Sequence, residues 1–312
     1  MHNWLQGTRK CFKNWNSSST AMEADIITEG FKASIEMHNL KYHRLIGDGD
    51  SSNMQRLPRE MPYGADLPVQ KVECMNHLLR TYISRLRDTA RKPKNSQGAV
   101  PILLRKKVGD NLQRIRVAIS AAVAYRRATT NSDKIKLLEE DIRKGTNHVF
   151  GDHEGCAEYF CKSPNEREEN LFPQMRSCGL WVDIRYANSL LARHSPSLIQ
   201  NVTNNVAESF NSLVAKYIGG KRINYCLRGS YQTRCEIATI SFNSRYRLQN
   251  KIHSGLTNAS PGKFTKINSK SLEKKALKRK SRQDFPSSFK RKQLQFDGPD
   301  EHYGQRDQNM EI

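Results

Sequence analysis

Apolar residues recur at helical spacing along much of the chain, and this periodicity predicts its principal elements. The first run predicts a helix over about 21–37, ended by Asn39, with Thr20 and Glu23 in the positions of a capping box. A later run predicts a helix over 204–217. The apolar stripe of that helix consists of Val206, Phe210, Leu213, Val214 and Tyr217. Amphipathic helices therefore occur near both ends of the patterned part of the chain.

Two short segments alternate between apolar and polar residues, which is typical of strands. They are LKYHRLIG at 40–47 and PVQKVEC at 68–74, and a short helix is expected between them near 52–57. From 75 to 199 the pattern is helical. This order of elements predicts a mixed, helix-rich α/β fold that is interrupted by an all-helical insertion over 75–199.

Two of the expected helices have recognisable ends. The segment SDKIKLLEEDIRKG predicts a compact helix that begins after Ser132 and ends before Gly145. Another helix is expected over about 230–250. No internal repeat is visible, so the chain is not an array of similar units.

The net charge of +21 is concentrated toward the C-terminus. Residues 261–294 contain 12 Lys/Arg and two acids, a composition too polar to bury a core. We therefore expect 251–312 to be a basic, disordered tail. Its cluster Lys278-Arg279-Lys280 is typical of phosphate binding or nuclear import. The charge favours a nucleic acid as the partner, with a solvated basic surface as the alternative, and the basic cluster indicates the nucleus as the location. No apolar run is long enough to span a membrane.

Two acidic positions are candidates for chemistry. Asp48 and Asp50 follow the first predicted strand in RLIGDGDSS, at the strand end where α/β sheets place ligands. A divalent cation would relieve their repulsion, but an ordinary Asp-Gly turn explains the same residues. Glu208 lies on the polar face of the 204–217 helix, where a solvated charge is also ordinary.

Seven scattered cysteines favour reduced thiols or a metal site. Cys74 and His77 stand three residues apart at a junction between a strand and a helix, which is at most half of a zinc site. The segment HVFGDHEGCAEYFC offers a fuller set of zinc ligands, with loop thiols and surface histidines as the alternative. Its candidate ligands are His148, His153, Cys156 and Cys161.

Basic residues alternate with tyrosines in GGKRINYCLRGSYQTRCE, a pattern that suits a nucleic-acid backbone with base stacking. A basic loop followed by an ordinary amphipathic helix is an equally good interpretation. The candidate DNA-binding residues here are Lys221, Arg222, Arg228 and Arg234.

Taken together, CFKNWN, STAMEADIITEGF, RLIGDGDSS, VECMNHLLR and NVTNNVAESFNSLVAKYIGGKR resemble the Mutator-like transposase domain over nearly all of 11–245. The resemblance implies an RNase H-like fold and a DDE triad that binds two Mg²⁺ or Mn²⁺ ions for DNA strand cleavage and transfer. By position, Asp48 matches the second acid, with Asp50 as the alternate, and Glu208 matches the glutamate. Cys74 and His77 match the Cys/His pair of the family.

The resemblance also divides the chain into regions. Residues 21–74 and 200–250 match part of an RNase H-like core, around the helical insertion, and 1–20 form an irregular N-terminal segment. Those first 20 residues contain no aspartate or glutamate. We therefore expect the first three strands and the first catalytic acid to be missing, which would leave a sheet edge exposed and the fold marginal unless another chain supplies strands.

Three functions remain open from the sequence. One is a truncated transposase-derived protein that is catalytically inactive, and another is a domesticated nuclear DNA-binding protein. The third is a basic protein that acts through its tail alone. Expected partners are DNA and either a second copy of the chain or a full-length transposase, and no small-molecule substrate is expected.

Overall fold

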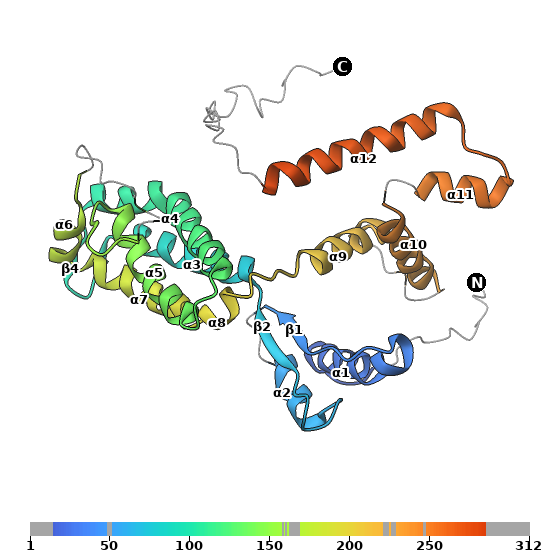
Figure 1. Cartoon of the computed structure of the whole chain (residues 1–312), viewed down its shortest axis with the longest axis horizontal. Coiled ribbons are helices and arrows are strands. Elements are labelled where there is room, and N and C mark those ends of the chain that lie inside the picture. Colours follow the sequence, from blue (N-terminus) through green and yellow to red (C-terminus); the bar gives the residue numbers. More distant parts are fainter. Residues whose placement is uncertain are drawn as a thin grey trace, which may run out of the picture.

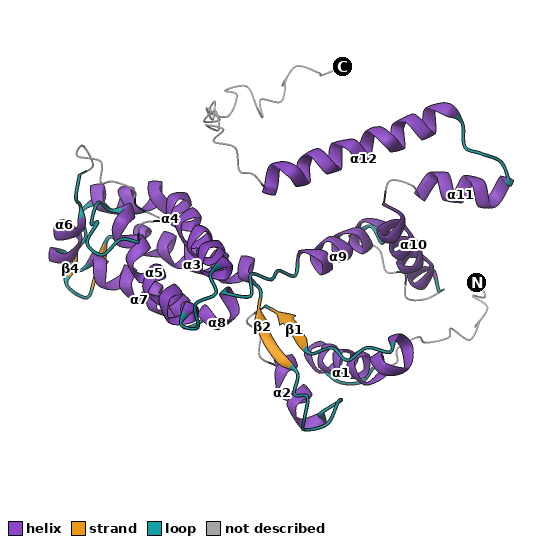
Figure 2. Cartoon of the chain, viewed as in Figure 1, coloured by secondary structure: helices purple, strands orange, loops and turns teal. Residues whose placement is uncertain are grey.

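The computed structural model describes residues 15–48, 52–157, 159, 161, 169–220, 225, 229–245 and 248–284. Residues 1–14 of the predicted N-terminal segment and residues 285–312 of the predicted tail lie outside this part of the chain, as does Asp50. Figure 1 shows a helical body, a small pair of strands beside it, and further helices beyond the strands. Helices account for most of the described residues, as the colouring of Figure 2 makes clear. The structure is thus mixed and helix-rich, as predicted.

Helix α1 (Ser19–His38) begins slightly earlier than its sequence pattern indicates. Ser18 is the N-cap, and its hydroxyl accepts a hydrogen bond from the Ala21 amide at 3.2 Å. The predicted capping box at Thr20 and Glu23 is therefore wrong, because the run of hydroxyl residues before Ala21 offers an earlier cap. Asn39 ends the helix in the left-handed conformation, as predicted.

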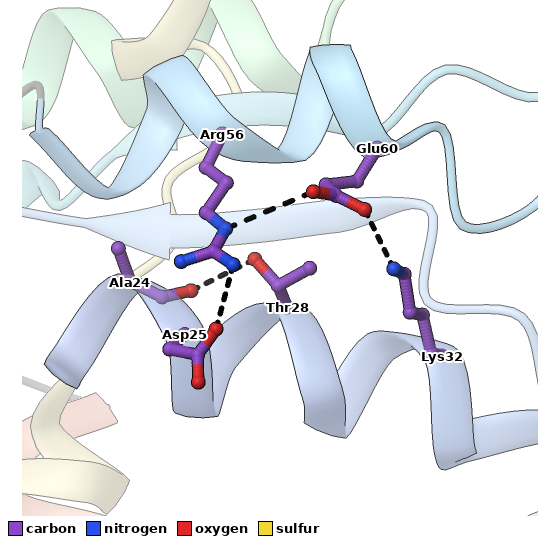
Figure 3. Close-up of polar contacts among 6 residues, drawn as sticks. All are labelled: Ala24, Asp25, Thr28, Lys32, Arg56 and Glu60. Atoms are coloured by element: carbon purple, nitrogen blue, oxygen red, sulfur yellow. Dashed lines mark hydrogen bonds and ion pairs between the residues drawn. The ribbon is translucent and has the colours of Figure 1, made fainter. Parts of the chain in front are cut away.

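Helix α2 (Ser52–Glu60) packs against α1. Leu57 and Phe31 are buried at this contact. Charged side chains border it: Figure 3 shows Arg56 reaching Asp25 at 2.7 Å and Lys32 reaching Glu60 at 2.6 Å. The hydrogen bond from Lys32 lowers the pKa of Glu60. Because these charges are exposed, the apolar contact contributes more to the stability of the helix pair than they do.

Strands β1 (Arg44–Gly47) and β2 (Gln70–Glu73) form a two-stranded parallel sheet, with Ile46 opposite Val72. Both strands are shorter than the segments predicted for them. Among the described residues no further strand joins this sheet. Ile46 is 38% exposed, so one face of β1 is partly uncovered.

The helical body contains one hydrophobic core whose buried residues run from Met75 to Ile199, the range expected for the insertion. Its apolar faces come from consecutive helices that fold back on one another. These helices are α3 (Met75–Arg91), α4 (Ile102–Ala128), α5 (Lys134–Val149), α6 (Phe172–Ser177), α7 (Leu180–Ala192) and α8 (Ser195–Leu198).

Two local features of the body differ from the sequence prediction. Helix α5 starts after Asp133 rather than Ser132, and it passes through Gly145 to Val149. Gly145 is buried, so tertiary packing here outweighs the low helix propensity of glycine. The sequence pattern also missed a small hairpin of β3 (Lys94–Asn95) and β4 (Gly98–Ala99), which is too short to show periodicity.

Beyond the body, α9 (Asn205–Tyr217) packs against α10 (Ser230–Ser244). They are followed by α11 (Leu248–Thr257) and α12 (Lys263–Asp284), where we expected a disordered tail. The polar composition of α12 does rule out a buried core there, but its many lysines, together with Leu272, Ala276 and Leu277, are good helix formers. No described helix combines the length and apolar character that a membrane crossing requires.

A buried polar cluster joins three helices of the body. The Tyr82 hydroxyl donates to Asn188 Oδ1 at 2.7 Å and lies 3.2 Å from the Thr146 hydroxyl. All three residues are at most 1% exposed. Burial raises the pKa of Tyr82, so the phenol keeps the proton that this network needs.

Replacing Tyr82 with Phe should lower the free energy of unfolding by about 1–2 kcal/mol, because Asn188 would keep a buried acceptor without its donor. Urea unfolding followed by circular dichroism measures this change. Tyr186→Phe is the matched control, since Tyr186 is 66% exposed on the same body. Equal stability of the two variants would contradict a structural role for the network.

Candidate functional site

The Asn204 side chain connects the ends of both parallel strands. Its amide nitrogen donates to Asp48 Oδ1 at 2.7 Å, just after β1. Its amide oxygen accepts from the Cys74 thiol at 3.0 Å, just after β2. Asn204 is also the N-cap residue of α9. We call Asp48, Cys74, Asn204 and Glu208 the strand-end site.

Main-chain hydrogen bonds fix the same place. The Cys74 amide donates to Gly47 O at 2.9 Å, which continues the ladder between the strands. The Met75 amide donates to Val202 O at 3.0 Å, and the Glu73 amide donates to the Ser197 hydroxyl at 3.2 Å. The segment before α9 is therefore held against the ends of the strands although it lies far away in sequence.

Glu208 lies in the first turn of α9, one turn after Asn204. Its amide donates to Asn204 O at 3.0 Å, and its side chain is exposed. Asp48 is exposed as well. Asn204 thus links the two acids that sequence analysis selected: it bonds directly to one carboxylate and begins the helix that carries the other.

Cys74 has a positioning role in this site. The residue is 1% exposed. Its thiol donates to Asn204 Oδ1, and its sulfur accepts a hydrogen bond from the main-chain amide of Asn204 at 3.5 Å. His77 is half-buried one turn into α3. The pair predicted from its spacing therefore supplies a buried thiol that holds Asn204.

Sequence analysis assigned no role to Asn204. The available signal was an asparagine at the first position of the helix predicted over 204–217, since asparagine is favoured at the N-cap. That signal does not identify Asp48 as a partner, because 156 positions separate the two residues.

A second cluster lies in the helical body, between the end of α5 and the loop that follows. The ligand atoms of His148, His153, Cys156 and Cys161 all lie within 4.8 Å of one another. The two Nδ1 atoms are 3.0 Å apart, and each also lies 3.5–3.6 Å from a cysteine sulfur. Burial, with the neighbouring Cys161 thiol, raises the pKa of Cys156 to about 11. All four residues that sequence analysis suggested for zinc are therefore together.

The four basic residues predicted to bind DNA around the start of α10 fall into two groups. Lys221, Arg222 and Arg228 lie outside the described residues. Arg234 donates to Tyr217 O at 2.7 Å and to the Ser230 hydroxyl, and its guanidinium lies 3.9 Å from the centre of the Tyr225 ring. These contacts give Arg234 a structural role between α9 and α10, where we had predicted a DNA contact.

Helix α12 presents a row of lysines along one face. Their spacing of three to four residues places them on neighbouring turns, and all of them are exposed. We call them the lysine row: Lys263, Lys266, Lys270, Lys274 and Lys278. The side chains of Arg279 and Lys280 are outside the described part.

A comparison of the sequence with family models identifies the family of this chain. A model described as Mutator-like transposase matches residues 3–161, just over half of the 312 residues. The chain therefore belongs to the Mutator-like transposase family, which confirms the resemblance seen in its sequence. No curated protein and no solved structure matches it.

The family match covers part of the site. Asp48, Cys74 and the whole His/Cys cluster lie within residues 3–161, whereas Asn204 and Glu208 lie beyond them. Membership implies transposase-related function, DNA as a partner and the general use of divalent metal ions. The match does not cover Glu208, so a role for that residue has to be argued from its position one turn after Asn204.

Replacing Asn204 with Ala should loosen the contact between the strand ends and α9, because Asp48 and Cys74 both lose their partner. We expect the Met75 amide, which is bonded to Val202 O, to exchange its hydrogen roughly 5- to 30-fold faster. Hydrogen exchange followed by mass spectrometry measures this. The control is Asn211→Ala, an exposed position on the same helix. An unchanged rate at Met75 would show that Asn204 does not hold the site together.

Proposed function

We propose that this chain is a DNA-binding protein of the Mutator-like transposase family whose strand-end site holds a divalent metal ion between Asp48 and Glu208. One observation supports this above all others: Asn204 bonds to Asp48 and begins the helix whose first turn carries Glu208. Asn204 therefore connects Asp48 to the helix that carries Glu208, although the two acids come from distant parts of the chain.

The donor chemistry of the site suits Mg²⁺ or Mn²⁺. Both ions prefer carboxylate oxygens, and Asp48 and Glu208 supply them. Asn204 is not proposed as a ligand, since its amide oxygen accepts from Cys74 and its nitrogen donates to Asp48. Its role is to orient the aspartate. When bound, a metal ion here supplies electrostatic activation of an attacking oxygen and stabilisation of the leaving one.

The parallel pair β1–β2 supports an RNase H-like arrangement for this part of the chain. β1 and β2 are neighbours in one sheet, and Asp48, which matches the second acid of the family's triad, directly follows β1. In that interpretation α1, β1, β2 and α9 are core elements, and α3 to α8 form the helical insertion. The exposed surface beside β1 is the place where further strands would join.

DNA binding, rather than cleavage by this chain alone, is the activity that we propose. Metal-dependent strand cleavage needs a full set of carboxylates, and the proposed site uses two. As an alternative to strand cleavage, a protein with this fold could act in the nucleus by binding DNA without catalysis. A partner with a complete site, such as a full-length transposase or another copy of the chain, would fit the same proposal.

The lysine row of α12 is the proposed contact for the DNA backbone. From Lys266 to Lys278 the helix advances about 18 Å, a length that spans several phosphates. The row is exposed throughout. It carries charge without an apolar core, so it favours backbone contacts rather than reading of base sequence.

Iron-directed cleavage tests the metal site. Fe²⁺ bound in place of Mg²⁺, with peroxide and ascorbate, should cut the main chain near Asp48 and Glu208, because radicals form at the metal. Asp48→Asn or Glu208→Gln should abolish both cuts, as each removes a carboxylate ligand. The control Glu36→Gln changes an exposed acid on α1 and should leave the cuts in place. Cuts that persist in both site variants would contradict the assignment.

Changing Lys266, Lys270, Lys274 and Lys278 to Ala should weaken binding to duplex DNA. The slope of log K against log salt should become shallower by about 0.9 for each phosphate contact removed. Fluorescence anisotropy at several salt concentrations measures both quantities. The matched control changes four exposed lysines elsewhere, namely Lys41, Lys92, Lys106 and Lys107.

The outcomes of that experiment separate the candidate functions. Complete loss of binding in the α12 variant would mean that the basic helix acts alone. Residual binding with a shallower slope would mean that the rest of the chain also contacts DNA. An equal loss in the control variant would contradict a specific role for the row. Cleavage of DNA with Mn²⁺ that disappears in Glu208→Gln would overturn the non-catalytic part of the proposal.

A further inference from the structure

The His/Cys cluster of the helical body has no role in the proposed function, and its chemistry points to a separate site. Two imidazoles and two thiols converge from one end of a helix and the loop after it. Neutral imidazole nitrogen and thiolate sulfur are the ligands that Zn²⁺ prefers, and four of them complete a closed structural site. The strand-end site, by contrast, offers carboxylate oxygens.

Three contacts within the cluster, in a group whose ligand atoms all lie within 4.8 Å of one another, come close to the separations around one tetrahedral ion. Bonds of about 2.0 Å to nitrogen and about 2.3 Å to sulfur place the ligand atoms of such a site roughly 3.3–3.8 Å apart. The nitrogen–sulfur distances of 3.6 Å and 3.5 Å lie in this range, and the Nδ1–Nδ1 distance of 3.0 Å is slightly below it. A small outward rotation of the two rings would therefore admit the ion.

The order of the ligands along the chain is consistent with the geometry. Four residues separate His148 from His153, and four separate Cys156 from Cys161. Each spacing is one that zinc fingers use within a ligand pair, although here the histidines come first. We propose that His148, His153, Cys156 and Cys161 bind one structural Zn²⁺.

The surroundings indicate what this ion would hold in place. Tyr159 lies between the two cysteines in sequence, and its ring stacks on Tyr125 of α4 at 3.8 Å. Its hydroxyl donates to Asp141 of α5 at 2.8 Å, beside the ion pair of Asp141 with Arg126. Zinc at the cluster would keep the loop, and Tyr159 with it, against both helices.

The base of the loop is already closed without metal. The Leu171 amide donates to Phe150 O at 2.9 Å, so the chain leaves and returns at one point. Gly151 lies at the crossing with φ near +84°, where a Cβ would approach Glu169 O to 2.6 Å. A zinc ion at the cluster would therefore hold the first part of this loop, up to Cys161, while the hydrogen bond between Leu171 and Phe150 already joins the two ends of the loop.

Zinc content measured on the purified full-length chain tests this proposal. Protein prepared in reducing buffer without added metal should contain about one Zn²⁺ per chain by plasma mass spectrometry. Cys156→Ser and His148→Ala should reduce zinc to background. The matched controls Cys178→Ser and Cys235→Ser change free cysteines outside the cluster and should keep the full amount.

A second measurement on the unmodified chain does not depend on the folding of variants. Co²⁺ exchanged into the site should give the visible absorption of a tetrahedral ion together with a thiolate charge-transfer band. A strong chelator should lower the melting temperature, and added Zn²⁺ should restore it. Wild-type protein that holds no zinc and takes up no Co²⁺ would overturn the proposal, and so would a disulfide between Cys156 and Cys161 in the freshly purified chain.

Discussion

The site depends on one side chain, the amide of Asn204. Its nitrogen holds Asp48 after β1, its oxygen holds the thiol of Cys74 after β2, and its main chain begins α9. An amide can do this because it carries a donor and an acceptor in a fixed plane. Because Cys74 is buried and Asp48 is exposed, Asn204 also connects the packed interior to the surface where the two acids lie. In the proposed site, Asn204 thus connects Asp48 to the helix that carries Glu208.

The helical body provides a rigid neighbour for that site. Its core extends from Met75, directly after Cys74, to Ile199, five positions before Asn204. The network of Tyr82, Asn188 and Thr146 lies inside this core and joins α3, α5 and α7. A buried polar network of this kind restricts how the three helices can pack. The two strands are short, and Ile46 opposite Val72 is their only cross-strand pair in which both residues are apolar. The body therefore contributes more buried surface than the sheet does.

The sequence predicted the parts of the structure that depend on local patterns. The apolar periodicity located α1 and α9 to within about two residues. The alternation in LKYHRLIG and PVQKVEC located both strands within longer segments. The prediction for α5 failed because tertiary packing carries the helix through Gly145. The prediction for α12 failed because its polar, basic composition was given more weight than the helix propensity of its residues. The four zinc ligand candidates were visible because they lie within 14 residues of one another. The bond between Asn204 and Asp48 was not, since no local spacing relates them, and only family resemblance placed Asp48 with Glu208.

The chain leaves the strand pair at Cys74 and returns at Asn204, and both points are joined by short hydrogen bonds. Topologically, the whole helical body is thus a single excursion whose two ends meet. Such an excursion can change in length or content over evolutionary time without displacing its ends, provided that its own core stays intact. The strand pair and the helical body can therefore change independently of each other in sequence, as long as the two ends of the body still meet at Cys74 and Asn204.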